Sequence, residues 1–294
     1  MRKLVFAAAL AILVWAALVV PLPLATVTPV PAQPVADIVA IDGGAVGDLP
    51  DDLLFTSVRL QQPTTVGTIS ILLDADRELV PIPSVVPSGI DPEEFVELQR
   101  RQFRESIRAA AAVGLRAADL EVSVSGQGAR VVATIPGTPA ADVLQQEDVI
   151  TEVEGETVSL ASELAAALAD SRAGDEVELT IRRDDELRTV TIEVADISEI
   201  GQPGIGVAVT TVDLQIDLPV DVGPTGDANV GGPSAGLMIA LAFYDAATNG
   251  ELTSRRVAGT GAIRLNGDVG PVSGIGEKVE GAIQAGAEVF LVPA

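Results

Sequence analysis

The sequence predicts an α+β protein of several domains behind an N-terminal transmembrane helix. Three observations lead to this fold class. The chain opens on an apolar segment, its middle is rich in short β-branched runs bounded by turns, and its last hundred residues place two glycine-rich segments around an apolar helix. With 294 residues, of which 48% are hydrophobic, the chain is long enough for more than one core.

The composition excludes many kinds of chemistry, because the chain has no His and no Cys. Catalysis by Ser-His-Asp or Cys-His groups, the ordinary zinc, haem and iron–sulfur sites, and disulfides all need one of these residues. We therefore expect no metal and no cofactor. A base that acts near neutral pH must be a carboxylate, the N-terminus, or a lysine with a lowered pKa, and the lysines are Lys3 and Lys278.

The balance of charges is strongly acidic. Lys and Arg number 18 against 42 Asp and Glu, which gives a formal net charge of −24. Such a chain repels the phosphates of nucleic acids unless it carries a local basic patch, and none is evident. The arginines between Arg100 and Arg116 alternate with acidic residues and are typical of a solvated helix face. We therefore expect no nucleic acid partner.

Residues 1–25 are predicted to form a single transmembrane anchor. Two basic residues precede an unbroken apolar run from Leu4 to Val20, which is close to the length of a bilayer span. The basic residues place the N-terminus in the cytoplasm, so we expect a single-pass protein of the cell membrane with an extracytoplasmic catalytic part. The alternative is a cleaved signal peptide, for which the weak candidate site ends at Ala36.

The next two segments are predicted to be a linker and a small α/β segment. Residues 26–36 contain TPVPAQP, which is typical of an extended proline-rich linker. Within residues 37–114 the sequence predicts a helix that begins after Asp91 and ends near Val113. Three short runs before it are predicted strands, at 37–41, 53–60 and 66–73. The sequence does not indicate what this segment does.

Residues 115–197 form a β-rich module whose motifs are similar to a bacterial PDZ domain. These motifs are Pro136-Gly137-Thr138-Pro139-Ala140, Glu147-Asp148-Val149-Ile150, Val153-Glu154-Gly155 and Gly174-Asp175-Glu176-Val177. The resemblance implies a groove that takes an extended peptide by strand addition, between a strand at 130–134 and a helix at 160–170. It points to Gly128, Arg130, Val131 and Val132 as peptide-binding residues. The alternative is a scaffold with a blocked groove.

The first glycine-rich segment, GPTGDANVGGPSAG, contains Ser234 and leads into an apolar helix that ends at Gly250. A serine among small neighbours at the start of a helix suits a nucleophile. Small residues let a substrate backbone approach, and free N–H groups at the helix start favour a developing oxyanion. A serine that simply caps the helix explains this segment equally well.

The second glycine-rich segment, residues 258–293, contains Lys278. It predicts two strands joined by a turn at Asn266-Gly267, a helix from about Gly276 to Ala285 and a buried strand at 289–292. Lys278 lies in the first helical turn, where the helix dipole disfavours a cation, and an apolar setting would lower its pKa further. The alternative is a surface lysine beside acidic neighbours.

Together the two segments resemble the proteolytic domain of the Lon proteases, which are serine–lysine peptidases. The matching residues are Gly232-Pro233-Ser234-Ala235-Gly236, Thr260-Gly261, Ile263, Leu265, Gly267, Val269, Pro271-Val272, Gly274-Ile275, Glu277-Lys278, Ala285-Gly286 and Val292-Pro293. The resemblance implies that Ser234 is the nucleophile and Lys278 the general base. It also implies supporting roles for Thr260 and for the loop residues Gly232, Pro233 and Ala235. Three departures leave the dyad in place, namely Gly231 for Asp, Ser273 for Gly and Ala262 for an acidic residue.

The order of anchor, PDZ-like module and Lon-like domain is similar to that of bacterial membrane-anchored PDZ–Lon proteins. Neither lysine stands in a phosphate-binding loop, so we expect an ATP-independent serine endopeptidase that acts on unfolded or extended extracytoplasmic proteins. The PDZ-like module would capture or gate these protein or peptide substrates. The sequence does not determine whether the chain forms a homo-oligomer. The alternative is an inactive, membrane-tethered peptide-binding scaffold. The predicted α/β Lon-type domain, residues 198–294, ends directly after a strand, which indicates a truncated record.

Overall fold

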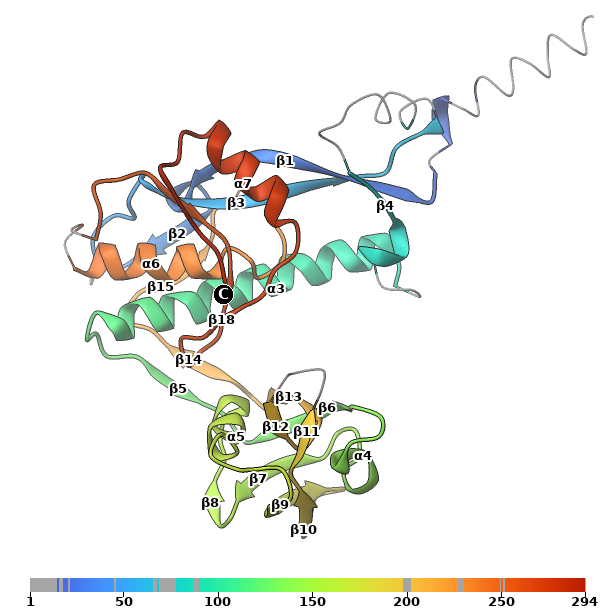
Figure 1. The fold of residues 1–294 in the computed structure, drawn as a ribbon. Helices are drawn as coiled ribbons and strands as arrows, with labels where there is room; N and C mark the ends of the chain where they lie inside the picture. Colours follow the sequence, from blue (N-terminus) through green and yellow to red (C-terminus); the bar gives the residue numbers. More distant parts are fainter. Residues whose placement is uncertain are drawn as a thin grey trace, which may run out of the picture. The chain divides into compact units, whose positions relative to one another are not determined.

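A computed structural model gives the fold of the chain (Figure 1). It describes residues 22–44, 46–65, 78–86, 90–197, 202–226, 230–248 and 252–293, with positions 15, 18–20, 68 and 250. The chain divides into two compact units. We call residues 1–121 with 218–294 the discontinuous unit, and residues 122–217, which interrupt it in sequence, the inserted unit.

The discontinuous unit is built on a five-stranded mixed sheet in the order β19-β16-β3-β1-β4. Its strands are β1 (Leu24–Pro34), β3 (Leu53–Gln61), β4 (Glu78–Pro81), β16 (Val257–Gly259) and β19 (Val289–Leu291). β1 pairs antiparallel with β3 and β4, whereas β16 pairs parallel with β3 and β19. The start of β3 is the apolar run Leu53-Leu54-Phe55, which is buried. Strands from both ends of the chain therefore share one core.

Helices and short strands complete this unit. α3 (Pro92–Ala117) packs against α6 (Gly236–Ala247), and α7 (Ile275–Gln284) packs against β1 and β3. Figure 1 draws α7 on the other side of β1 and β3 from α3 and α6. The contacts are close, because a Cβ on Gly114 of α3 would lie 2.2 Å from the Ala240 carbonyl oxygen of α6. The remaining elements are η1 (Val35–Asp37), β2 (Val39–Asp42), η2 (Ile82–Ser84), β15 (Asp221–Pro224), β17 (Ala262–Ile263) and β18 (Val269–Gly270).

The predicted linker at 26–36 is a strand for most of its length, since β1 runs to Pro34 and η1 follows. Proline cannot donate to a sheet ladder, which is why the sequence favoured an extended linker. The register between β1 and β3 shifts between Val30 and Gln33, and Pro31 lies within this irregularity, whereas Pro29 and Pro34 are in register with residues of β3. The segment at 37–114 likewise supplies β2, β3, β4 and α3 to the discontinuous unit. It does not form a unit of its own.

The predicted transmembrane fold class and the single-pass membrane localisation are corrected by the structure. No helix within the described residues is both long and apolar enough to cross a bilayer. Most of the apolar run on which the prediction depended, residues 1–14, 16–17 and 21, lies outside the described residues, as does much of the predicted strand at 66–73. Leu24, which the prediction placed in the anchor, begins β1. The described fold class is therefore mixed α+β.

The inserted unit contains a sheet with the path β10-β9-β7-β6-β13. These strands are β6 (Ala129–Thr134), β7 (Val149–Val153), β9 (Glu176–Arg183), β10 (Glu186–Glu193) and β13 (Val207–Thr211). The turn between β9 and β10 forms at Asp184 and Asp185, both at positive φ. The other elements are β5 (Ser123–Ser125), α4 (Pro139–Val143), β8 (Glu156–Thr157), α5 (Ala161–Ala167), β11 (Ala195–Ile197), β12 (Gln202–Gly204) and β14 (Gln215–Asp217).

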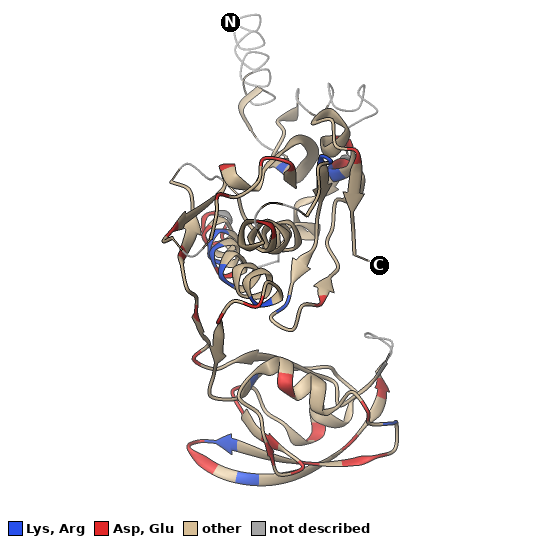
Figure 2. Ribbon diagram, turned by 90° about the vertical axis from the view of Figure 1, so that its left-hand side faces the viewer, with Lys and Arg blue, Asp and Glu red and all other residues tan. Residues whose placement is uncertain are grey.

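Charged groups occur on both units, and basic groups recur along α3 (Figure 2). Arg100, Arg101 and Arg104 are exposed there and alternate with exposed acidic residues such as Glu97 and Glu105. This arrangement is the solvated helix face that the sequence predicts.

Candidate active site

Ser234 lies in the turn that leads into α6. The N-cap position of α6 is Ala235, and no side chain caps the helix. Within the described part of the chain, Ser234 Oγ makes no hydrogen bond. The structure therefore does not use Ser234 as a helix cap, and its hydroxyl is left for another role.

Lys278 is almost fully buried, with 4% of its surface exposed. It is the fourth residue of α7, and its Nζ donates a hydrogen bond to Thr260 Oγ1 at 3.1 Å. None of the described carboxylates lies within ion-pair distance of Nζ. Burial lowers the pKa of Lys278 by removing the ammonium from water, and the negative charge of Glu277 opposes this shift only in part. The interpretation of Lys278 as a surface residue is therefore excluded.

Thr260 connects Lys278 to the main chain of Ser234. It follows β16 directly, its side chain is fully buried, and its Oγ1 donates to the Ser234 carbonyl oxygen at 3.2 Å. The Gly261 N–H donates to the same carbonyl at 2.8 Å. The hydroxyl thus accepts a hydrogen bond from Lys278 and donates one to the Ser234 carbonyl oxygen, so it acts as both acceptor and donor.

The loop before Ser234 is held by α3 through Gln99, a residue that the sequence motifs did not indicate. The Gly232 N–H donates to the Gln99 main-chain carbonyl at 2.8 Å, and Gly232 has a φ of 79°. The Gly232 N–H is therefore not free for an oxyanion, and Pro233 has no N–H. The N–H groups of Ser234 and Ala235 donate to no described residue and remain as candidate donors.

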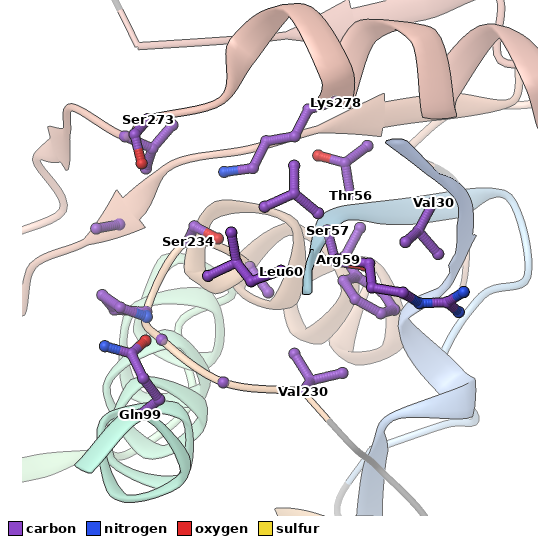
Figure 3. A pocket seen from close by; sticks show the side chains of 18 of the residues that line it. Val30, Thr56, Ser57, Arg59, Leu60, Gln99, Val230, Ser234, Ser273 and Lys278 are labelled. Carbon is purple, nitrogen blue, oxygen red and sulfur yellow. The ribbon is translucent and has the colours of Figure 1, made fainter. Parts of the chain in front are cut away.

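Ser234 and Lys278 both line a cavity of about 910 Å³ (Figure 3). Its walls come from β1, η1 and β3, from Phe95 and Gln99 of α3, from residues 230–235, and from residues 271–273. The segment at 37–114, whose role the sequence did not reveal, therefore supplies much of the wall. The two side chains of the predicted dyad do not hydrogen-bond to each other in this structure, although catalytic hydrogen bonds often tighten only when substrate is bound.

In the inserted unit, the structure does not support β6 as the peptide-accepting strand. β6 lies inside the sheet between β7 and β13, and Val131 is fully buried. A Cβ on Gly128 would meet a valine side chain and a carbonyl oxygen at under 3 Å, and the half-buried Arg130 lies 3.8 Å from Glu147. The exposed Val132 is in the same internal strand. The strands at the two ends of the sheet are β13, which pairs with β6, and β10. The sequence does not show which strands become neighbours, so the position of β6 was not evident from it.

β13 packs against α5, and the Ala161 N–H at the start of that helix donates to Thr211 Oγ1 at 3.0 Å. β13 and α5 thus lie together at one of the two edges of this sheet where a further strand can be added. As for metals, no group of three Asp or Glu side chains among the described residues is arranged to hold an ion.

Comparison with known proteins finds similarity for two parts of the chain. Residues 206–294 match the family of the Lon protease (S16) C-terminal proteolytic domain, and residues 109–194 match the PDZ domain family. Residues 206–294 are therefore similar to the proteolytic domain of a serine peptidase, and residues 109–194 are similar to a PDZ domain.

Particular relatives match these two parts separately. Lon protease 2 of Herpetosiphon aurantiacus is 40% identical over 79 residues, 27% of this chain and 9% of that protein. A probable periplasmic serine endoprotease DegP-like of Halomonas elongata is 36% identical over 95 residues, 32% of this chain and 20% of that protein. The PDZ domain of an SdrC-like protein from Listeria monocytogenes is 30% identical, with a TM-score of 0.27, over 28% of this chain and 87% of that one. The chain thus spans a small part of each full-length protease.

Proposed function

We propose that this chain is a serine endopeptidase that hydrolyses unfolded or extended polypeptides with Ser234 as nucleophile and Lys278 as general base. The observation that carries the proposal is the buried Lys278, which has no ion-pair partner among the described residues, in the same cavity as a serine whose hydroxyl is uncommitted. Burial favours the neutral amine, the form of lysine that can accept a proton.

The reaction follows from these groups. Neutral Lys278 takes the proton of Ser234 Oγ as the oxygen attacks the peptide carbonyl, and the N–H groups of Ser234 and Ala235 stabilise the resulting oxyanion. The ammonium of Lys278 then gives its proton to the leaving amine, which breaks the C–N bond and leaves an acyl-enzyme. The same amine next accepts a proton from water as the water attacks the ester, and it returns that proton to Ser234 Oγ as the ester bond breaks and the acid product leaves. Thr260 keeps the lysine directed toward the serine throughout.

The cavity suits an extended substrate. β16 pairs with β3 only as far as Phe55, so the following residues of β3, from Thr56 to Leu60, have no strand on that side among the described residues and line the cavity. An extended polypeptide can pair with such an edge through its main chain. In the inserted unit, the β13 edge beside α5 is the corresponding place where the PDZ domain would capture a peptide. Because neither lysine lies in a phosphate-binding loop, we expect cleavage by this chain to need no ATP.

The proposal is tested by incubating the purified chain with an unfolded casein-like substrate, without ATP, and following the cleavage products by mass spectrometry. Ser234→Ala and Lys278→Ala should abolish cleavage and leave the urea unfolding midpoint intact. Ser273→Ala is the matched control, since Ser273 lines the same cavity but is exposed and has no place in the mechanism. Cleavage that survives Ser234→Ala would refute the assignment. Capture of peptides without any cleavage would instead favour the peptide-binding scaffold.

A further inference from the structure

Gln99 contributes two separate groups to the active site. Its main-chain carbonyl accepts the hydrogen bond from Gly232. Its side-chain carboxamide lies over the same glycine, because a Cβ placed on Gly232 would be 2.8 Å from Gln99 Oε1. Gly232 is two residues before Ser234, so the carboxamide lies beside residues 230–235, which we call the nucleophile loop. Figure 3 shows it on the cavity side of α3, below Ser234.

The carboxamide of Gln99 makes no hydrogen bond with any described residue. Polar side chains in a cavity wall usually have a partner, and an amide offers two donor hydrogens and an acceptor oxygen. A peptide group presents the complementary C=O and N–H. The chemistry of this group therefore matches a substrate main chain.

The opposite wall of the cavity supports the same conclusion. There the unpaired side of β3, from Thr56 to Leu60, faces the space that contains Ser234 and Lys278. A polypeptide that pairs with this edge has main-chain groups on its other side as well, because strand hydrogen bonds alternate between the two sides. Those groups need a partner from α3 or from the nucleophile loop.

We propose that the Gln99 carboxamide is a substrate-binding group that hydrogen-bonds the main chain of an extended polypeptide from the side opposite β3. This inference rests on the proposed peptidase function and identifies a residue of that site. Gln99 thereby holds the scissile bond in register with Ser234, and its main-chain carbonyl independently holds the loop.

The two roles of Gln99 separate in one substitution. Gln99→Ala removes the carboxamide but keeps the carbonyl that accepts from Gly232, and alanine suits a helix. Gln99→Glu keeps the size of the side chain and loses its donors at neutral pH. Gln102→Ala, one turn further along α3 and outside the cavity wall, is the matched control.

The experiment measures kcat and KM for cleavage of an internally quenched peptide by the wild-type chain and these variants, with Ser234→Ala as the blank. Loss of one hydrogen bond predicts that Gln99→Ala raises KM by about three- to tenfold, with kcat within about twofold. We expect Gln99→Glu to raise KM as Gln99→Ala does, and Gln102→Ala to keep the KM and kcat of the wild type. An unchanged KM would overturn the inference. A fall in kcat at constant KM would also overturn it, because the side chain would then act on the transition state.

A binding measurement keeps this test distinct from that of the peptidase function. Anisotropy of a fluorescent peptide with an amidated C-terminus should show weaker binding to Ser234→Ala/Gln99→Ala than to Ser234→Ala, by the same factor as the change in KM. If the wild type cleaves nothing, the peptidase proposal fails while this arm still decides the role of Gln99. Equal binding by both variants would overturn that role.

Discussion

Replacing Thr260 by Val tests whether the buried hydroxyl supports catalysis. The change conserves shape but removes the acceptor of the Lys278 hydrogen bond at 3.1 Å and the donor to the Ser234 carbonyl at 3.2 Å. Lys278 gains its proton in the transition state, so the lost bond is one to a developing charge. Such bonds contribute about 1.5–3 kcal/mol, which corresponds to a fall in kcat of about 10- to 150-fold.

The pH dependence of kcat gives a second readout of the same variant. A hydrogen bond from the ammonium favours the charged form, so its loss lowers the pKa of Lys278 below the already lowered value. The acid limb of the profile should therefore move to lower pH in Thr260→Val. Thr260→Ser retains the hydroxyl and should stay within about threefold of wild type. A Thr260→Val enzyme with unchanged kcat and an unchanged pH midpoint would refute the role of this hydroxyl.

Three other predictions follow from the same structure. Because burial lowers the pKa of Lys278, kcat should rise with pH as the amine becomes neutral, with a midpoint below 10.5, and a midpoint at or above that value would contradict the proposed base. Burial tends to raise the pKa of Asp148, but hydrogen bonds from an arginine and a backbone N–H outweigh it and hold the pKa below 3.8. The ionised Asp148 therefore stabilises the folded state above pH 3.8, and this stabilisation is lost as the pH falls through the lowered pKa of the folded state. Asp148→Asn should lower the free energy of unfolding of the inserted unit by about 3 kcal/mol at pH 7, measured by urea unfolding. An unchanged urea midpoint would contradict this role of Asp148. Gly232 has a positive φ and lies against a side chain of α3, so Gly232→Ala should displace the nucleophile loop and lower kcat by about tenfold or more. A Cβ on Gly276 meets nothing within 4 Å, so Gly276→Ala should leave kcat unchanged. Equal activities of the two variants would contradict this prediction.

Features that depend on neighbouring residues could be predicted from the sequence. The helix expected after Asp91 is α3, and the helix expected from about Gly276 is α7, which begins one residue earlier. A cap such as Asp91 is local, so it is visible in the order of residues. The predicted end of α3 near Val113 was wrong, because the helix continues through Gly114 to Ala117. The two glycine-rich segments are also local, and they carry the family resemblance that the comparisons support.

Features that depend on distant segments could not be predicted. The prolines of β1 indicated a linker, yet the strand forms because β3, some thirty residues on, and β4 pair with it. The peptide-accepting edge was expected on β6, but β13, which follows the predicted module in sequence, pairs with β6 and leaves it inside the sheet. Strand order is a matter of which segments meet, and a single sequence does not state it.

The sequence by itself determined which groups are available for chemistry. A chain with no His, no Cys and lysines only at positions 3 and 278 leaves few bases, and the glycine-rich loops mark where a serine and a lysine stand. The tertiary structure alone decided how Lys278 behaves. Its pKa depends on burial, and β1, β3 and Thr260, which lie far from it in sequence, create that burial. The same is true of Gln99, since only folding brings α3 against the nucleophile loop.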